Sequence, residues 1–84
     1  SKAEKDLKAG KLDEAKAVID ATVVAPEVME SKKGGPSKDA AKAWYVKAMV
    51  YAALDTTKEA KFKSLESNPF KIAQEAFEKA MQID

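Results

Sequence analysis

Acidic pairs are the first residues of this chain to consider for chemistry. The closest pairs are Asp13 with Glu14 and Glu75 with Glu78. General acid–base catalysis needs a positioned group of tuned pKa, most often a histidine or a buried carboxylate. The chain has no histidine, and both acidic pairs lie near lysines on what should be solvated helix faces. No loop has the ligand spacing of a calcium site. We therefore expect no enzyme, no metal site and no cofactor.

The remaining composition excludes further classes of protein. All 15 basic residues are lysines, they oppose 14 acidic residues, and the net charge is +1. Nucleic-acid sites need a basic stripe and bidentate arginine contacts, so no nucleic-acid partner is expected. The absence of cysteine excludes disulfides, thiolate metal sites and cysteine nucleophiles. No apolar run approaches the roughly 18 residues of a membrane span, and we expect none.

One loop combines two lysines with two glycines, between Ser31 and Pro36. Lysine ammonium groups and open backbone amides could bind an anion there. A phosphate-binding loop, however, follows a strand and ends in Lys-Ser or Lys-Thr, and this segment has neither feature. The pattern favours a flexible connector.

Four helices account for the periodicity of the chain. Apolar residues recur at helical spacing over the ranges 1–9, 12–24, 38–54 and 69–83. Gly10 ends the first helix. Ser37 is the expected N-cap of the third helix, and Asn68-Pro69 starts the fourth. No period-2 pattern and no hairpin signal occurs, so the predicted fold class is all-α.

The third helix is expected to be the central layer of the fold. Between residues 43 and 51 it is apolar on two sides. A surface helix needs only one apolar stripe, so two stripes predict neighbours on two sides. We expect one side to pack on the last helix and the other on the second helix. The first side comprises Trp44, Ala48 and Tyr51, and the second comprises Val46 and Val50.

The last helix combines an apolar stripe with a polar ladder. Before this helix, Phe62 and Leu65 are expected to anchor the irregular segment, with one helical turn around residues 59–65. The polar ladder of the last helix has i, i+4 spacing and comprises Lys71, Glu75 and Lys79. The stripe comprises Phe70, Ala73, Phe77, Ala80 and Met81, with Ala76 beside it.

These elements predict one domain over residues 1–84. Short turns between paired helices make the members of each pair antiparallel. A generic four-helix bundle would show the same alternation of apolar faces and is the alternative architecture. The predicted parts are a first helix pair (1–25), a connector (26–37) and a second helix pair (38–84) with an irregular insertion (55–67).

The second pair carries a recurring pattern of large and small residues. Its first helix reads Trp44-x2-Lys47-Ala48-x2-Tyr51, and its second reads Ala73-x3-Phe77-x2-Ala80. This resembles the tetratricopeptide repeat, with its Trp-x2-Leu-Gly-x2-Tyr, Ala-x3-Phe and closing Pro. The alanines should let the paired helices approach closely, and the aromatic residues should fill the space beside them. The first pair matches mainly in its turn and second helix, over residues 10–15.

Three departures from the repeat pattern matter. Lys47 stands where the family usually has an apolar residue. The closing proline has no counterpart before Asp84. Trp44 and Ala73 lie about thirteen residues further apart than in a 34-residue repeat, which makes residues 55–67 an insertion.

The resemblance implies a non-enzymatic scaffold that holds a peptide or protein segment in a groove lined by the first helix of each unit. Tyr45, Met49 and a lysine on one helix face would suit a peptide with an acidic end. The alternative is that Tyr45 and Met49 pack against Val28, Met29 or the inserted segment. By spacing from Trp44, the groove positions are Lys42, Tyr45, Met49, Ala52 and Ala53.

A second function stays open, that of a structural spacer or self-assembly piece of a larger cell-envelope protein. Repeat arrays generally need three or more units, so we expect further repeats outside this chain or a homo-oligomer. Long insertions and an arginine-free composition look similar to tetratricopeptide proteins exported in bacteria. The resemblance thus favours the bacterial periplasm or cell envelope over the cytoplasm.

Overall fold

The computed structural model describes residues 1–83, and Asp84, the last residue of the predicted second pair, lies outside them. The described chain is all-α, as predicted. It has no strand within residues 1–83, only an isolated antiparallel bridge between Glu30 and Pro36. The helices are α1 (Lys2–Lys8), α2 (Leu12–Thr22), α3 (Pro26–Met29), α4 (Ala40–Thr56), α5 (Ala60–Lys63) and α6 (Pro69–Ile83).

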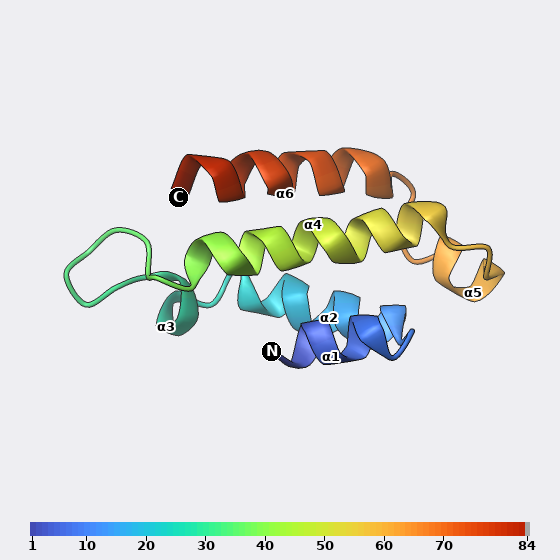
Figure 1. Cartoon of the computed structure of the whole chain (residues 1–84), viewed down its shortest axis with the longest axis horizontal. Helices are drawn as coiled ribbons and strands as arrows, with labels where there is room; N and C mark the ends of the chain where they lie inside the picture. The colour runs from blue at the N-terminus through green and yellow to red at the C-terminus, as the bar shows by residue number, and fades with distance from the viewer. Residues whose placement is uncertain (84) are drawn as a thin grey trace.

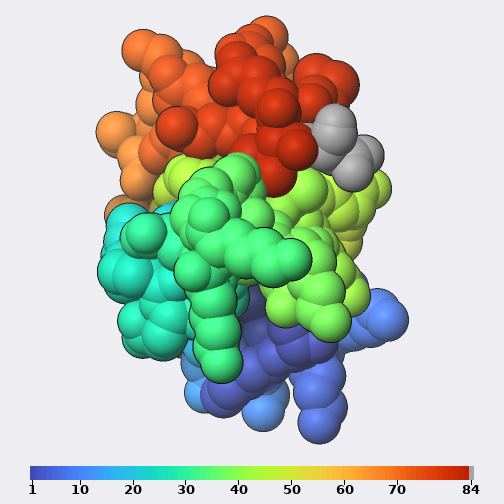
Figure 2. All heavy atoms as spheres, turned by 90° about the vertical axis from the view of Figure 1, so that its left-hand side faces the viewer, coloured from blue at the N-terminus to red at the C-terminus, as the bar shows by residue number. Residues whose placement is uncertain are grey.

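The helices form three layers in an elongated molecule of 44 × 22 × 17 Å (Figure 1). The α1–α2 pair makes one outer layer, α4 the middle layer and α6 the other outer layer. Successive long helices run in opposite directions, since each is joined to the next at the end where it finishes. Viewed along the long axis, the same order is visible from the blue N-terminal pair through green to the red C-terminal helix (Figure 2).

The prediction that the third helix is central is confirmed. Helix α4 contacts each of the other five helices. Val46 and Val50 are buried in one core cluster with residues of α2, among them Ala15 and Ile19. On the opposite side Ala48 is fully buried. Because α4 buries side chains in two directions, it needs an apolar surface on two sides, as its sequence has.

The turn between α1 and α2 contains the glycine that was predicted to end the first helix. Gly10 has a φ of +76°, a left-handed conformation that favours glycine. At the other end of α1, the Ser1 hydroxyl accepts a hydrogen bond from the Glu4 amide, and the Glu4 carboxylate folds back to Ser1 as a capping box. Ala3 is buried against the core, so even this short helix contributes an apolar contact.

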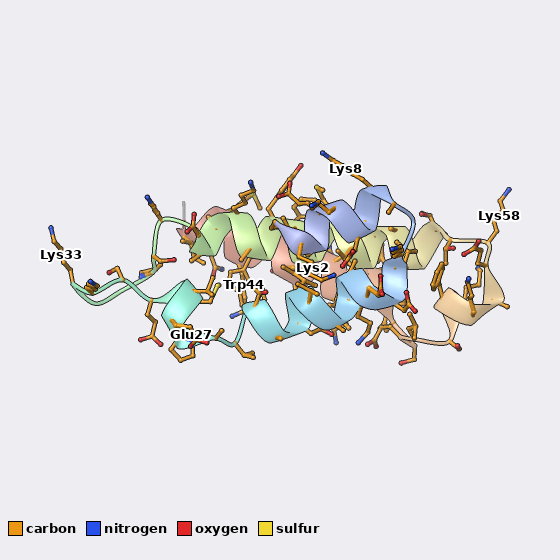
Figure 3. All side chains as sticks on the ribbon, turned by 90° about the horizontal axis from the view of Figure 1, so that it is seen from below. Lys2, Lys8, Glu27, Lys33, Trp44 and Lys58 are labelled. Atoms are coloured by element: carbon orange, nitrogen blue, oxygen red, sulfur yellow. The ribbon has the colours of Figure 1, made fainter. Side chains whose placement is uncertain are left out.

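The connector (26–37) folds into a short helix and a hydrogen-bonded loop. It contains α3, and the lysine loop after it is closed by a hydrogen bond from the Ser31 amide to the Gly35 carbonyl. The predicted N-cap role of Ser37 is wrong, because α4 begins at Ala40 with Asp39 as its N-cap residue. The Ser37 hydroxyl instead donates to the Val28 carbonyl and ties the end of the connector to α3. Lys33 marks the tip of this loop, at one end of the molecule (Figure 3).

The predicted apolar stripe of α6 is only partly buried. Ala73, Ala76 and Ala80 are buried at the contact with α4. Phe70 and Met81 are 62% and 71% exposed, so the stripe is not buried at these two positions. An alanine-lined contact lets two helices approach closely, and it leaves no space between them for large side chains. The large residues therefore lie at the edge of the contact.

The segment between α4 and α6 is anchored as expected. Its single helical turn, α5, buries Phe62, and Leu65 packs against the core at its side. The predicted solvent-facing ladder of α6 lies at the surface, although no ion pair joins Lys71, Glu75 and Lys79 within the described chain. All three side chains are exposed.

Two surfaces beside the α4–α6 contact

The predicted groove positions lie on one side of α4 and differ in exposure. Lys42 and Ala52 are exposed, and Tyr45 is 48% exposed. Met49 and Ala53 are half-buried, and Ala53 packs against the core. Three of the five predicted groove positions are therefore exposed, and the inserted segment 55–67 does not bury this side of α4.

Tyr45 has a neighbour that differs from those expected. Its ring meets the ring of Phe77 edge-on, with centroids 5.4 Å apart and planes at 67°. This geometry places the positive edge of one ring against the negative face of the other. Tyr45 thus packs on α6, rather than on Val28, Met29 or the inserted segment.

The Tyr45–Phe77 pair forms one wall of an open hollow between α4 and α6, of about 630 Å³. Ala41 and Ala80 are the small residues of its lining, and Met81, 71% exposed, is the most exposed of its large apolar residues. We call this surface the Tyr45 face. It is lined by Lys38, Ala41, Lys42, Tyr45, Phe77, Ala80 and Met81.

One lysine of the Tyr45 face is held in place from another layer. The Lys42 ammonium lies 3.3 Å from the Glu4 carboxylate, which links α4 to α1. The N-terminal ammonium group and Lys42 together lower the pKa of Glu4. Lys38 forms no ion pair with any residue of the described chain. Its charge, like that of the largely exposed Lys42, is available at the surface.

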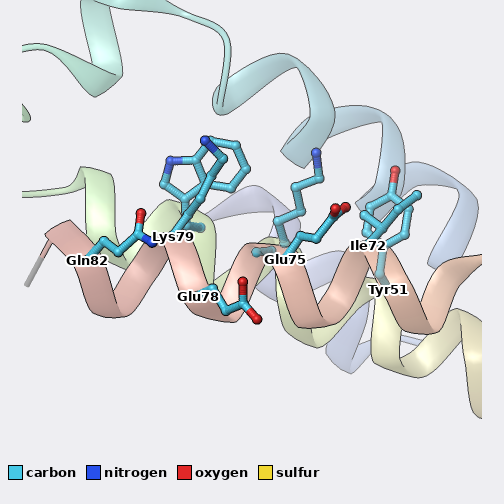
Figure 4. Close-up of a pocket in the computed structure, with 9 residues that line it drawn as sticks. Tyr51, Ile72, Glu75, Glu78, Lys79 and Gln82 are labelled. Atoms are coloured by element: carbon cyan, nitrogen blue, oxygen red, sulfur yellow. The ribbon is translucent and has the colours of Figure 1, made fainter.

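The opposite side of the α4–α6 contact has a different character (Figure 4). The ammonium groups of Lys47 and Lys79 lie 5.3 and 5.1 Å from the centre of the Trp44 ring. Cations at this distance are attracted to the electron-rich face of an indole. We call this surface the Trp44 face. It is lined by Trp44, Lys47, Tyr51, Ile72, Glu75, Ala76, Glu78, Lys79 and Gln82.

A carboxylate of α2 organises the polar groups next to Trp44. The Tyr51 hydroxyl donates to Asp20, 2.7 and 2.8 Å from its two oxygens. Lys16 donates to the same carboxylate at 2.9 Å, and Lys47 lies 3.8 Å away. No buried side-chain nitrogen or oxygen in the described residues lacks a partner. The cluster satisfies its own hydrogen bonds.

The cluster shifts two pKa values in the same direction. Burial and then the hydrogen bond to Asp20 raise the pKa of Tyr51 to about 12. The hydrogen bond to Asp20 likewise raises the pKa of Lys16. The hydrogen bonds act in this direction because they favour the protonated, donating form of each group, and for Tyr51 burial is the larger cause.

A third hollow, of about 380 Å³, lies between the first helix pair and α4. Its lining is largely apolar and includes Val18, Ile19, Val28 and Val46. Lys42 lines both this hollow and the Tyr45 face. Its ion pair with Glu4 of α1 holds it between the two surfaces.

Sequence reasoning missed Asp20 and Lys16, the two α2 residues of the Trp44-face cluster. Their i, i+4 spacing is a visible signal for an ion pair, but nothing local connects it with Tyr51, which lies 31 residues further on. It also missed the surface role of Phe77 and Met81. The sequence signal for this exposure was the row of alanines, because Ala73, Ala76 and Ala80 form the side of α6 that contacts α4.

Among residues 1–83, no three acidic side chains come close enough together to hold a metal ion. No helix within the same residues combines the length and apolar character needed to cross a membrane. Comparison of the chain with family models, curated proteins and solved structures finds no match.

Proposed function

We propose that this protein is a non-enzymatic scaffold of tetratricopeptide type that holds a peptide or protein segment on the Tyr45 face. The observation that carries the proposal is the exposure of Tyr45, Phe77 and Met81 beside two lysines that face solvent. Exposed apolar clusters with a polar rim are typical of interaction sites.

The contrast with the Trp44 face supports this choice of surface. On the Trp44 face, the ring of Trp44 is covered by two lysine side chains and Tyr51 donates to Asp20. A partner binding there would have to displace contacts that the chain already makes. On the Tyr45 face, a partner would bury apolar surface that water covers in the free chain, and this burial favours binding.

The helix arrangement supports the tetratricopeptide part of the proposal. Small residues of the repeat pattern, Ala48, Ala73 and Ala80, are buried where α4 meets α6. Lys47 departs from that pattern, and its ion pair with Asp20 together with its position over Trp44 explains how a lysine is accommodated.

The ligand that suits the Tyr45 face is an amphipathic segment with acidic residues at one end. Its apolar side chains would contact Tyr45, Phe77 and Met81, since aromatic and methionine surfaces adapt to varied partners. Its carboxylates would lie near Lys38 and Lys42, where their charge is complementary.

A displayed library of random peptides, selected on the purified chain, tests the proposal. Selected peptides should share apolar positions flanked by Asp or Glu. The single variants Tyr45→Ala and Met81→Ala should weaken their binding, measured by fluorescence anisotropy, by about tenfold each, as expected for anchor residues. Val24→Ala is the matched control, because Val24 is 75% exposed and does not line the Tyr45 face. Selection without enrichment, or binding that both variants leave unchanged, would refute the proposal.

A further inference from the structure

The exposed apolar residues of the Tyr45 face continue along α6 as a strip. Phe77 and Met81 line the face itself, and Phe70 lies beyond it on the same side of the helix. The three positions fall within about 40° of one another around the axis, at about 100° per residue. Because Phe70 and Met81 are both largely exposed, the strip extends for about 16 Å, at about 1.5 Å per residue. That length matches about three turns of a bound helix.

Helix α4 forms the other side of the strip, and its register with α6 follows from one contact. Tyr45 meets Phe77, and the two helices run antiparallel (Figure 1). Residue 52, seven positions after Tyr45, therefore lies opposite residue 70, seven positions before Phe77. Ala52 is exposed and small, so it leaves the side of Phe70 open to a partner.

The two ends of the strip differ in charge. Lys38 and Lys42 line the Tyr45 face where α4 begins. Lys38 forms no ion pair with any residue of the described chain. At the other end, the strip finishes on Ala52 and Phe70, which carry no charge. A partner with carboxylates at one end therefore binds better in one direction than in the other.

The backbone around the strip determines the form of a bound segment. Residues 41–53 and 70–81 lie inside α4 and α6, where N–H and C=O groups bond within the helix. An extended segment on this strip would bury its own N–H and C=O groups without backbone partners, which is unfavourable. A helical segment satisfies its own backbone and presents apolar side chains at i, i+4 and i+7. The strip therefore favours a helix.

The dipole of that helix sets its direction. Acidic residues stabilise the N-terminal turn of a helix, because the dipole is positive there. A helical segment with acidic residues at one end is therefore most stable when that end is its N-terminus. Placing these carboxylates beside Lys38 and Lys42 puts the N-terminus of the segment where α4 begins. The segment then runs parallel to α4 and antiparallel to α6.

We propose that the Tyr45 face binds an amphipathic helix that runs parallel to α4, with acidic residues of its first turn beside Lys38 and Lys42. Its apolar side chains contact Tyr45, Phe77 and Met81. The inference rests on the proposed function, because it gives the form and direction of the segment bound at the same face.

Three synthetic peptides of about 15 residues, about 22 Å as a helix, test the form of the ligand. The first has Glu in its first turn and Leu at i, i+4, i+7 and i+11. The second has proline at its centre and should bind at least about tenfold more weakly by fluorescence anisotropy, because proline breaks the helix. The third has the reverse sequence and should bind about fivefold more weakly, because Glu in the last turn opposes the dipole.

Two charge reversals test the position of the acidic turn. Lys38→Glu should weaken binding of the first peptide about fivefold, because like charges then meet. Lys71→Glu is the matched control, since it makes the same charge change on an exposed lysine that does not line the Tyr45 face, next to Phe70 at the other end. It should change binding less than about twofold. Equal effects of the two variants would overturn the proposed direction.

Spin labels test the direction without changing the strip. Lys33 and Lys58 lie at opposite ends of the molecule, before and after α4 (Figure 3). The chain has no cysteine, so Lys33→Cys and Lys58→Cys each take a single nitroxide. The label at position 33 should broaden the NMR signals of the N-terminal half of the first peptide, and the label at position 58 those of its C-terminal half. The opposite pattern, or equal broadening of both halves, would overturn the direction.

The outcomes separate this inference from the proposed function. Library-selected peptides that bind through Tyr45 while the first synthetic helix fails to bind would leave the function standing and refute the helical form. A proline peptide that binds as tightly as the first peptide would have the same meaning. If neither the selected peptides nor the synthetic helix binds, the function and the inference fail together. Helical circular dichroism induced on binding, with the expected order of affinities, supports the inference.

Discussion

Trp44 and Tyr45 are adjacent in the chain and lie on opposite sides of the α4–α6 contact. The Trp44 ring is half-buried and covered by Lys47 and Lys79. The Tyr45 ring is 48% exposed and meets one other aromatic ring, Phe77. A helix rotates by about 100° per residue, so two neighbouring aromatic side chains can serve different surfaces.

The two faces differ in whether their polar and aromatic side chains have partners within the chain. On the Trp44 face, one carboxylate, Asp20, accepts from Tyr51 and Lys16 and attracts Lys47. That face stabilises the layers α2, α4 and α6 against one another. On the Tyr45 face, apolar side chains and a lysine charge remain at the surface. The proposed function therefore assigns stability and binding to opposite sides of the same helix pair.

The largest expected effect is on stability, from Trp44→Ala. Removing this ring leaves a cavity beside the helix contact and ends two cation–π contacts, so the free energy of unfolding should fall by roughly 3 kcal/mol. Tyr45→Ala, its neighbour, should lower it by only about 1 kcal/mol, chiefly through the lost contact with Phe77. Urea unfolding followed by circular dichroism measures both.

Equal losses from the two alanine variants would contradict the division between the faces. The same variants give the converse result in the anisotropy assay. There Tyr45→Ala should weaken peptide binding, whereas any effect of Trp44→Ala should follow only from its lower stability.

The second prediction concerns the pH dependence that Asp20 gives to the Trp44 face. The folded-state pKa of Tyr51, about 12, lies above the ordinary value of 10.0, so the folded chain keeps this proton longer than the unfolded chain. The stabilisation is complete below pH 10 and is lost as the pH rises toward 12, by roughly 2 kcal/mol. The raised pKa of Lys16 acts in the same direction. Urea unfolding at several pH values in this window measures the loss.

Tyr51→Phe is the matched control for the pH prediction. It should cost about 1 kcal/mol at neutral pH through the lost hydrogen bond. It should also make unfolding free energy less dependent on pH above 10. Parallel pH profiles for wild type and Tyr51→Phe would show that the Tyr51–Asp20 contact does not hold the proton. Ultraviolet titration in a Tyr45→Phe background follows the single remaining phenol directly.

Much of the fold could be predicted from local pattern. The helix boundaries were visible at Gly10 and Asn68-Pro69, and the central layer was visible in the helix that is apolar on two sides between Ala43 and Tyr51. These features could be predicted because capping and periodicity depend on near neighbours in the sequence. Ser37 was misassigned as an N-cap because its hydroxyl bonds to the Val28 carbonyl, nine residues earlier. No local rule encodes that contact.

The surfaces were harder to predict for the same reason. Periodicity groups Phe70, Phe77 and Met81 with the alanines of α6, since all lie within one broad apolar sector. Which part of a broad sector faces the neighbour depends on side-chain size in both helices. Ala48 of α4 is the partner that makes the alanine side of α6 the contact side.

The smallest expected effect tests the residue that departs from the repeat pattern. Lys47→Met removes a charge 3.8 Å from Asp20 and keeps a long side chain against the rings of Trp44 and Tyr51. Asp20 keeps its two shorter contacts, so the free energy of unfolding should change by less than about 1 kcal/mol. Lys16→Met is the matched variant, since it removes the 2.9 Å contact with the same carboxylate and should cost more. Urea unfolding of both variants ranks them. A larger loss from Lys47→Met would mean that Lys47, rather than Lys16, is the main cationic partner of Asp20, and that the departure from the pattern is what stabilises the Trp44 face.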